Sequence, residues 1–77
     1  DEQTEAQMQS LVKIYESMKP KDAARIFEEL DLEVLLAVIE RMKERKTAPI
    51  LAQMNPQRAK TVTLELAQRR ELPIPRD

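Results

Sequence analysis

The chain has 77 residues, with no Gly, Cys or His and only two aromatic residues, and its formal net charge at pH 7 is −1. The missing residue types exclude thiol nucleophiles, imidazole bases and the usual zinc ligands, and they leave Ser and Thr without a base to activate them. We therefore expect neither an enzyme nor a cofactor or metal site. Good helix formers dominate the composition, so we expect one small all-α domain.

The first helical pattern covers residues 2–18. Its apolar residues follow the 3.6-residue period of a helix and form one stripe: Met8, Leu11, Val12, Tyr15 and Met18. Residues 1–10 are strongly polar, and we interpret them as the end of a helix that continues an upstream segment. Met8 and Leu11 are candidate contacts for a partner protein, but packing within the domain would also explain them.

Pro20 and Asp31 mark the starts of the second and third helices. Proline suits the first helical position because its fixed φ and missing N–H cost nothing there. Asp31 is a favourable N-cap for a third helix that runs to about Lys43. This third segment has a wide apolar face and is the most hydrophobic element, so we expect it to lie at the centre of the fold.

A fourth helix is predicted to start between Glu44 and Thr47 and to end at Met54. It contains Pro49, which a helix tolerates only in its first turn because the ring removes a backbone hydrogen-bond donor. The residues that we expect this helix to bury are Ile50, Leu51 and Met54.

A fifth helix is predicted from Pro56 to about Arg70, with Asn55 as its N-cap. The final stretch, ELPIPRD, contains two prolines, and we expect residues 73–77 to form an extended tail. Two apolar residues of this stretch either bind a partner protein or lie back on their own domain: Leu72 and Ile74.

One corner pattern, Met-x-Pro-x-x-Ala, occurs twice at an offset of 36 residues. The same offset aligns apolar residues with apolar residues along the flanking helices, so we interpret it as an internal repeat. The small Ala one turn after each Pro would let two helices approach closely. Helical hairpins of this kind cannot bury their apolar faces alone and stack side by side. The corner residues are Met18, Pro20 and Ala23, and then Met54, Pro56 and Ala59.

Three stretches carry a resemblance to a known family: Met18-Lys19-Pro20 with Ala23-Ala24, Arg41-Met42-Lys43 before Ala48, and Met54-Asn55-Pro56 with Ala59. They resemble the MgtE N-terminal-type domain, and the resemblance covers residues 11–72. That domain occurs in magnesium-transporter regulatory domains and, in a related form, in FliG-like flagellar rotor proteins. The resemblance implies five short helices in a small right-handed superhelix of proline-cornered hairpins.

Within this group the chain looks most like the MotE-like periplasmic chaperones of the flagellar motility protein MotC. The resemblance implies a non-enzymatic domain that binds and stabilises such a protein in the periplasm, without nucleic acid and without inserting into the membrane. MotE-like chains carry a signal peptide and a long helical segment before this domain, and that upstream helix would allow a homodimer. The alternative is the cytosolic, magnesium-sensing domain of an MgtE-type transporter.

Two charged clusters have both a structural and a functional interpretation. An acidic cluster could bind Mg²⁺ only if its carboxylates converge, whereas capping and solubility explain it without a metal. The basic stretch 41–46 suits the negative end of a helix dipole, and nucleic-acid binding would need a broader basic face. The acidic residues are Glu28, Glu29, Asp31 and Glu33.

Charge is distributed unevenly along the chain. Residues 1–38 carry nine acidic and four basic side chains, a net charge of −5, and residues 39–77 carry five acidic and nine basic side chains, a net charge of +4. This polarity could steer a charged partner or head-to-tail contacts, and solvated helix faces would produce it as well. No apolar run approaches the ~20 residues that span a bilayer.

Overall fold

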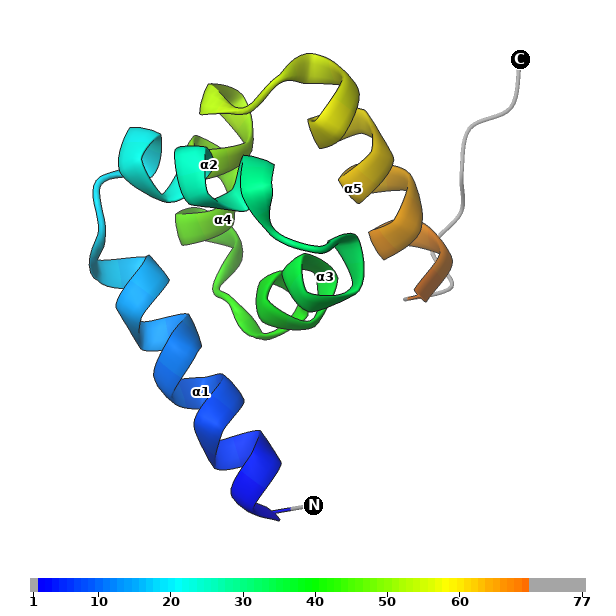
Figure 1. The fold of residues 1–77 in the computed structure, drawn as a ribbon. Coiled ribbons are helices and arrows are strands. Elements are labelled where there is room, and N and C mark those ends of the chain that lie inside the picture. Colours follow the sequence, from blue (N-terminus) through cyan, green and yellow to red (C-terminus); the bar gives the residue numbers. More distant parts are fainter. Residues whose placement is uncertain (1, 70–77) are drawn as a thin grey trace.

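Residues 2–69 are described by a computed structural model, with side chains from Thr4 onward, and this part of the chain forms helices without any strand (Figure 1). The all-α prediction of five helices is confirmed, and the predicted helix ends agree with the structure to within two residues. The helices are α1 (Glu2–Ser17), α2 (Pro20–Glu29), α3 (Leu32–Arg41), α4 (Glu44–Gln53) and α5 (Pro56–Arg69).

Consecutive helices are joined by links of two residues, and each link begins 12 residues after the one before it. The sequence suggested one corner used twice. Within residues 2–69 there are instead four corners, so the 36-residue offset is three periods of a 12-residue repeat. Each link begins with a large apolar side chain that is at least half-buried. The links are Met18–Lys19, Leu30–Asp31, Met42–Lys43 and Met54–Asn55.

Local signals fix the starts of the helices. Proline occupies the first position of α2 and of α5, where no N–H is needed. Asp31 caps α3, since its carboxylate accepts a hydrogen bond from the N–H of Glu33 at 3.1 Å. Asn55 caps α5 in the same way, with its Oδ1 atom 2.9 Å from the N–H of Gln57. Both N-caps agree with the sequence-based expectation.

Contrary to the sequence-based expectation, Pro49 does not lie in the first turn of its helix. Helix α4 begins at Glu44, and Pro49 is therefore its sixth residue. The carbonyl of Arg45 consequently lacks its usual N–H partner within the helix. The helix still continues through this point because Ile50, only 2% exposed, anchors the following turn in the core.

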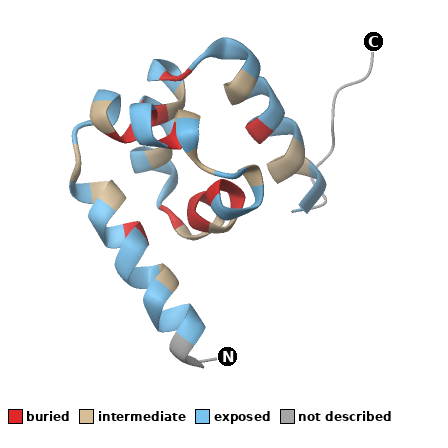
Figure 2. Ribbon diagram, in the orientation of Figure 1, coloured by how far each residue is buried: buried red, intermediate tan, exposed pale blue. Residues whose placement is uncertain are grey.

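The helices pack by a next-but-one rule (Figure 1). Helix α1 packs on α3, α2 on α4, and α3 on α5, and α4 also contacts α5. The central position of α3 agrees with the prediction, because it contacts helices on both sides and contributes four residues to the core (Figure 2). The Tyr15 ring meets the buried Phe27 ring edge to face, with the ring centroids 5.1 Å apart.

Two positions of the 12-residue repeat show opposite patterns of burial. The front positions are Val12, Ala24, Leu36, Ala48 and Lys60, of which the first three are buried and the last two exposed. The rear positions are Ile14, Ile26, Val38, Ile50 and Val62, of which the first two are exposed and the last three buried. Within residues 2–69, α1, α2 and α3 are each followed by a next-but-one helix on which they pack. In the same way, α3, α4 and α5 are each preceded by a next-but-one helix. Front positions therefore face the helix that follows in the stack, and rear positions face the helix that precedes.

Candidate functional site

Carboxylates on the front side of α1 and α2 tie these helices to later corners. Glu16 lies four residues after the front position Val12 and accepts a hydrogen bond at 2.8 Å from the backbone N–H of Lys43. Glu28 makes the equivalent bond with the N–H of Asn55, and the sequence separation is 27 residues in both cases. Each donor is the residue immediately before a helix, where backbone N–H groups lack partners within the helix. The same cap is thus used twice, one repeat apart.

Arginines on the rear side of α3 and α5 contact the helices that precede them in the stack. The guanidinium of Arg41 forms two hydrogen bonds with the carboxylate of Glu5 on α1, at 2.8 and 2.9 Å. Arg69 at the end of α5 pairs with Glu33 and Glu40 of α3. The guanidinium of Arg69 therefore links α5 to α3. These ion pairs confirm the direction assigned to the rear positions.

The pair between Glu5 and Arg41 changes the acidity of the carboxylate. Hydrogen bonds from Arg41 and then from Gln9 lower the pKa of Glu5 from 4.5 to about 2. The side chain of Glu5 is half-exposed, so the pair is partly screened by water. Glu5 therefore remains ionised well into the acidic range in the folded chain.

Arg58 is a structural residue that sequence reasoning missed. Its guanidinium reaches from α5 to the C-terminal end of α2, where it donates hydrogen bonds to the carbonyls of Phe27, at 3.0 Å, and of Leu30. A cation there satisfies carbonyls that the helix leaves free and offsets the negative end of its dipole. The only signal in the sequence was an arginine in the first turn of a helix, where an acid is favoured.

Three of the four residues in the predicted acidic cluster take part in structural contacts. Glu28 caps the corner before α5, Asp31 caps α3, and Glu33 pairs with Arg69. The three carboxylates thus bind different partners, namely the backbone before α5, the backbone at the start of α3 and the guanidinium of Arg69. They do not converge on one point. Among the residues that the structure describes, no group of three or more acidic, His or Cys side chains could hold a metal ion. None of the described helices is long and apolar enough to cross a membrane.

The rear end of the stack exposes an apolar surface on α1 and α2. Ile14 is 54% exposed, and Leu11 and Ile26 are each 37% exposed. We call these three residues the rear patch. The sequence singled out Leu11 as a candidate partner contact, but it did not single out Ile14 or Ile26. Met8, the other candidate on this helix, is half-buried against the core.

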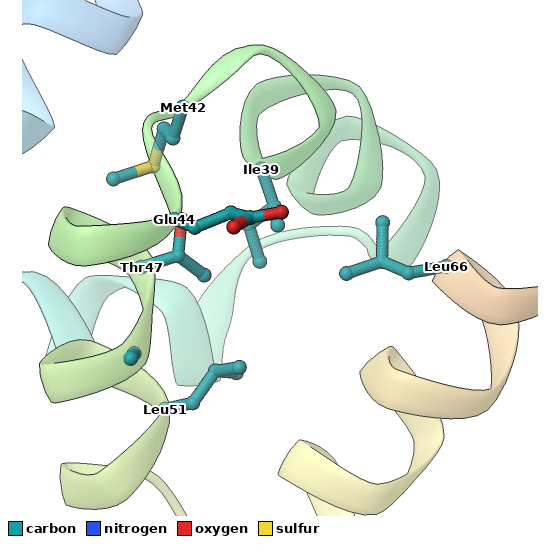
Figure 3. A pocket seen from close by; sticks show the side chains of 7 residues that line it. Ile39, Met42, Glu44, Thr47, Leu51 and Leu66 are labelled. Carbon is teal, nitrogen blue, oxygen red and sulfur yellow. The ribbon is translucent and has the colours of Figure 1, made fainter. Parts of the chain in front are cut away.

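The front end of the stack contains an open hollow of about 230 Å³ between α3, α4 and α5 (Figure 3). Leu51 of α4 and Leu66 of α5 lie on opposite sides of it, and Ile39 of α3 lies at one end. The front position Ala48 also lines the hollow, which we call the front hollow. Its remaining lining residues are Met42, Glu44 and Thr47.

The other predicted site residues are distributed over the two proline corners. Ala23 is fully buried, whereas Ala59 is half-buried against the core. Met54 is buried and Met18 half-buried, while Pro20 and Pro56 are exposed at the helix starts. Leu72, Ile74 and the predicted tail at residues 73–77 lie outside the described residues. Of the four predicted partner contacts, the structure describes only Met8 and Leu11.

Comparison with known proteins identifies one match. The family model described as the MgtE intracellular N domain matches residues 3–71. No curated protein and no solved structure matches the chain.

Proposed function

Because the chain belongs to the family of MgtE intracellular N domains, we propose that it is a non-enzymatic domain that binds a partner protein. The partner that we propose is a MotC-like flagellar motility protein, which the domain would stabilise in the periplasm as MotE-like chaperones do. The proposal takes its site from the structure and its partner from the resemblance carried by the three stretches at Met18, Arg41 and Met54.

The front hollow is the observation that carries a binding role. Its lining is mainly apolar, and it is open at the end of the stack rather than closed in the core. Ala48 lines it at a front position, and the equivalent Val12, Ala24 and Leu36 are each covered by the next-but-one helix. A partner segment with apolar side chains would occupy the place that a further helix takes elsewhere in the stack. Burial of apolar surface would then drive binding.

Deletion of the gene tests the chaperone role in cells. We expect the amount of the MotC-like protein to fall and swimming to be lost, because the partner would be degraded without its chaperone. Restoring the gene should restore both. Normal amounts of the motility protein together with normal swimming would contradict the proposal.

The family assignment also supports a second candidate, the regulatory domain of an MgtE-type magnesium transporter. In that role acidic side chains would have to bind Mg²⁺. Glu28 and Glu33 are instead engaged with the backbone of Asn55 and the guanidinium of Arg69, which favours the protein-binding role. A calorimetric titration with Mg²⁺ separates the two candidates. We expect no saturable heat, and a saturable heat would favour the transporter domain.

A further inference from the structure

We propose that copies of this chain associate head to tail, with the front end of one copy packed on the rear patch of the next. The inference rests on the two ends of the stack that no other helix of residues 2–69 covers, and it does not depend on the proposed function. It concerns the chain's own surfaces, which the structure describes on both sides of the contact.

The next-but-one rule defines the geometry of this contact. If α1 and α2 of a second copy follow α5 of the first, α4 pairs with the second α1 and α5 pairs with the second α2. The exposed rear positions Ile14 and Ile26 would then be covered, as Val38, Ile50 and Val62 already are within one copy. In the same step the exposed front positions of α4 and α5 would be covered. A single contact would thus cover the front end of one copy and the rear end of the next.

The side chains at the two ends are complementary in size. On the front side of α4, Ala48 and Ala52 are small and exposed, so they would let Leu11 and Ile14 of the next copy approach closely. Ala24 has this role within one copy, where α2 packs on α4. On α5 the exposed apolar residue is Leu64, which is 40% exposed and would face α2 of the next copy.

The capping carboxylates show that α4 and α5 differ from the earlier helices. Glu16, Glu28 and Glu40 each lie four residues after a front position, and all three take part in hydrogen bonds or ion pairs with a later element. The equivalent residues of the last two helices are Ala52 and Leu64. An apolar residue replaces the carboxylate at the two helices that have no next-but-one helix after them within residues 2–69.

Charge is complementary across the same contact. Lys60 is the front position of α5, and Glu29 lies on α2, the helix that it would meet. On the larger scale residues 1–38 carry a net charge of −5 and residues 39–77 carry +4. Opposite charges on the two ends would orient approaching copies front to rear and would weaken the contact at high salt.

A contact between two different surfaces does not close after two copies, so association should continue as concentration rises. The contact would also cover the front hollow. A second copy and a bound partner would therefore exclude each other at that end of the stack.

Sedimentation velocity of the 77-residue chain tests this inference. From micromolar to millimolar concentration we expect the weight-average mass of the wild type to rise beyond that of a dimer, and added salt should lower it. Ile14→Glu, which blocks the rear patch, and Ala48→Glu, which blocks the front end, should each remain monomeric. Their controls, Lys13→Glu and Gln53→Glu, add a carboxylate to the same helices outside the two surfaces and should associate like the wild type.

A mixture of the two blocked variants provides the sharpest readout. The intact front end of Ile14→Glu can still bind the intact rear patch of Ala48→Glu, so the mixture should form a one-to-one dimer that does not grow further. Helical circular dichroism of each variant checks that it is folded. A wild type that stays monomeric throughout, a blocked variant that still dimerises alone, or a mixture that fails to dimerise would overturn the inference.

Discussion

Single charged side chains help to position the helices of this domain, together with the apolar core. Glu16 and Glu28 each bond to a backbone N–H at a distant corner, and Arg58 bonds to two carbonyls at the end of α2. All three serve backbone groups that helix ends leave without partners. The charged residues of this chain therefore include specific structural contacts, and solubility does not account for all of them.

Glu28→Ala should destabilise the chain by about 1–2 kcal/mol, because the N–H of Asn55 at the start of α5 would lose its charged acceptor. Denaturant unfolding measures this change. Glu29→Ala is the matched control, since Glu29 is the exposed neighbour on the same helix, and its effect should be small. Equal destabilisation by the two variants would show that the cap at the α4–α5 corner has no special role.

The pair between Glu5 and Arg41 predicts a pH dependence of stability. Since the folded-state pKa of Glu5 is lowered to about 2, the pair contributes stability in full above the ordinary pKa of 4.5 and loses it as the pH falls toward 2. Glu5→Gln should therefore be less stable than the wild type at neutral pH. The difference in unfolding free energy should shrink between pH 4.5 and pH 2. A difference that does not change over this range would contradict the pairing.

At the scale of the helices, short elements persist because tertiary contacts fix both ends. Helix α4 illustrates this best, since it has ten residues, a lysine rather than a capping side chain before it, and a proline in its interior. Its start is fixed by the bond between Glu16 and the N–H of Lys43, and its middle is anchored by Ile50. Isolated helices of this length are unstable in water, so packing must supply the stability.

Pro49→Ala should raise the melting temperature, because alanine restores an N–H for the carbonyl of Arg45 and removes the clash of the ring with the preceding turn. We expect a gain of about 1 kcal/mol, reduced by the contacts that the ring makes beside Ile50. Pro20→Ala is the matched control, because the first position of α2 needs no N–H, and it should change stability little. A melting temperature lowered by Pro49→Ala would show that the ring's contacts outweigh the missing hydrogen bond.

For the complete fold, the sequence predicted where the helices begin and end, but it did not predict which helices pack together. Pro20, Asp31 and Pro56 are strong local start signals, and the helices begin within a residue of them. The 12-residue period was missed because the links at Leu30–Asp31 and Met42–Lys43 have no proline after them, so only the first and last of these corners look alike.

The surfaces at the two ends could not be predicted from helical periodicity. Ile14 and Ile26 occupy the same repeat position as the buried Val38, Ile50 and Val62. They are exposed because α1 and α2 have no next-but-one helix before them within residues 2–69. The front hollow requires side chains from α3, α4 and α5, whose relative placement is set by tertiary packing. Which helices pair is a property of the tertiary structure, and a single sequence gives no direct sign of it.

We propose that this domain binds a MotC-like motility protein in the front hollow. The most direct test is the affinity of the purified chain for that protein, measured by titration for the wild type, Ala48→Glu and Gln53→Glu. We expect the wild type and Gln53→Glu to bind equally. We expect Ala48→Glu to bind at least about tenfold more weakly, since a carboxylate would stand in the apolar hollow. Absence of binding by the wild type, or equal binding by all three chains, would contradict the proposal.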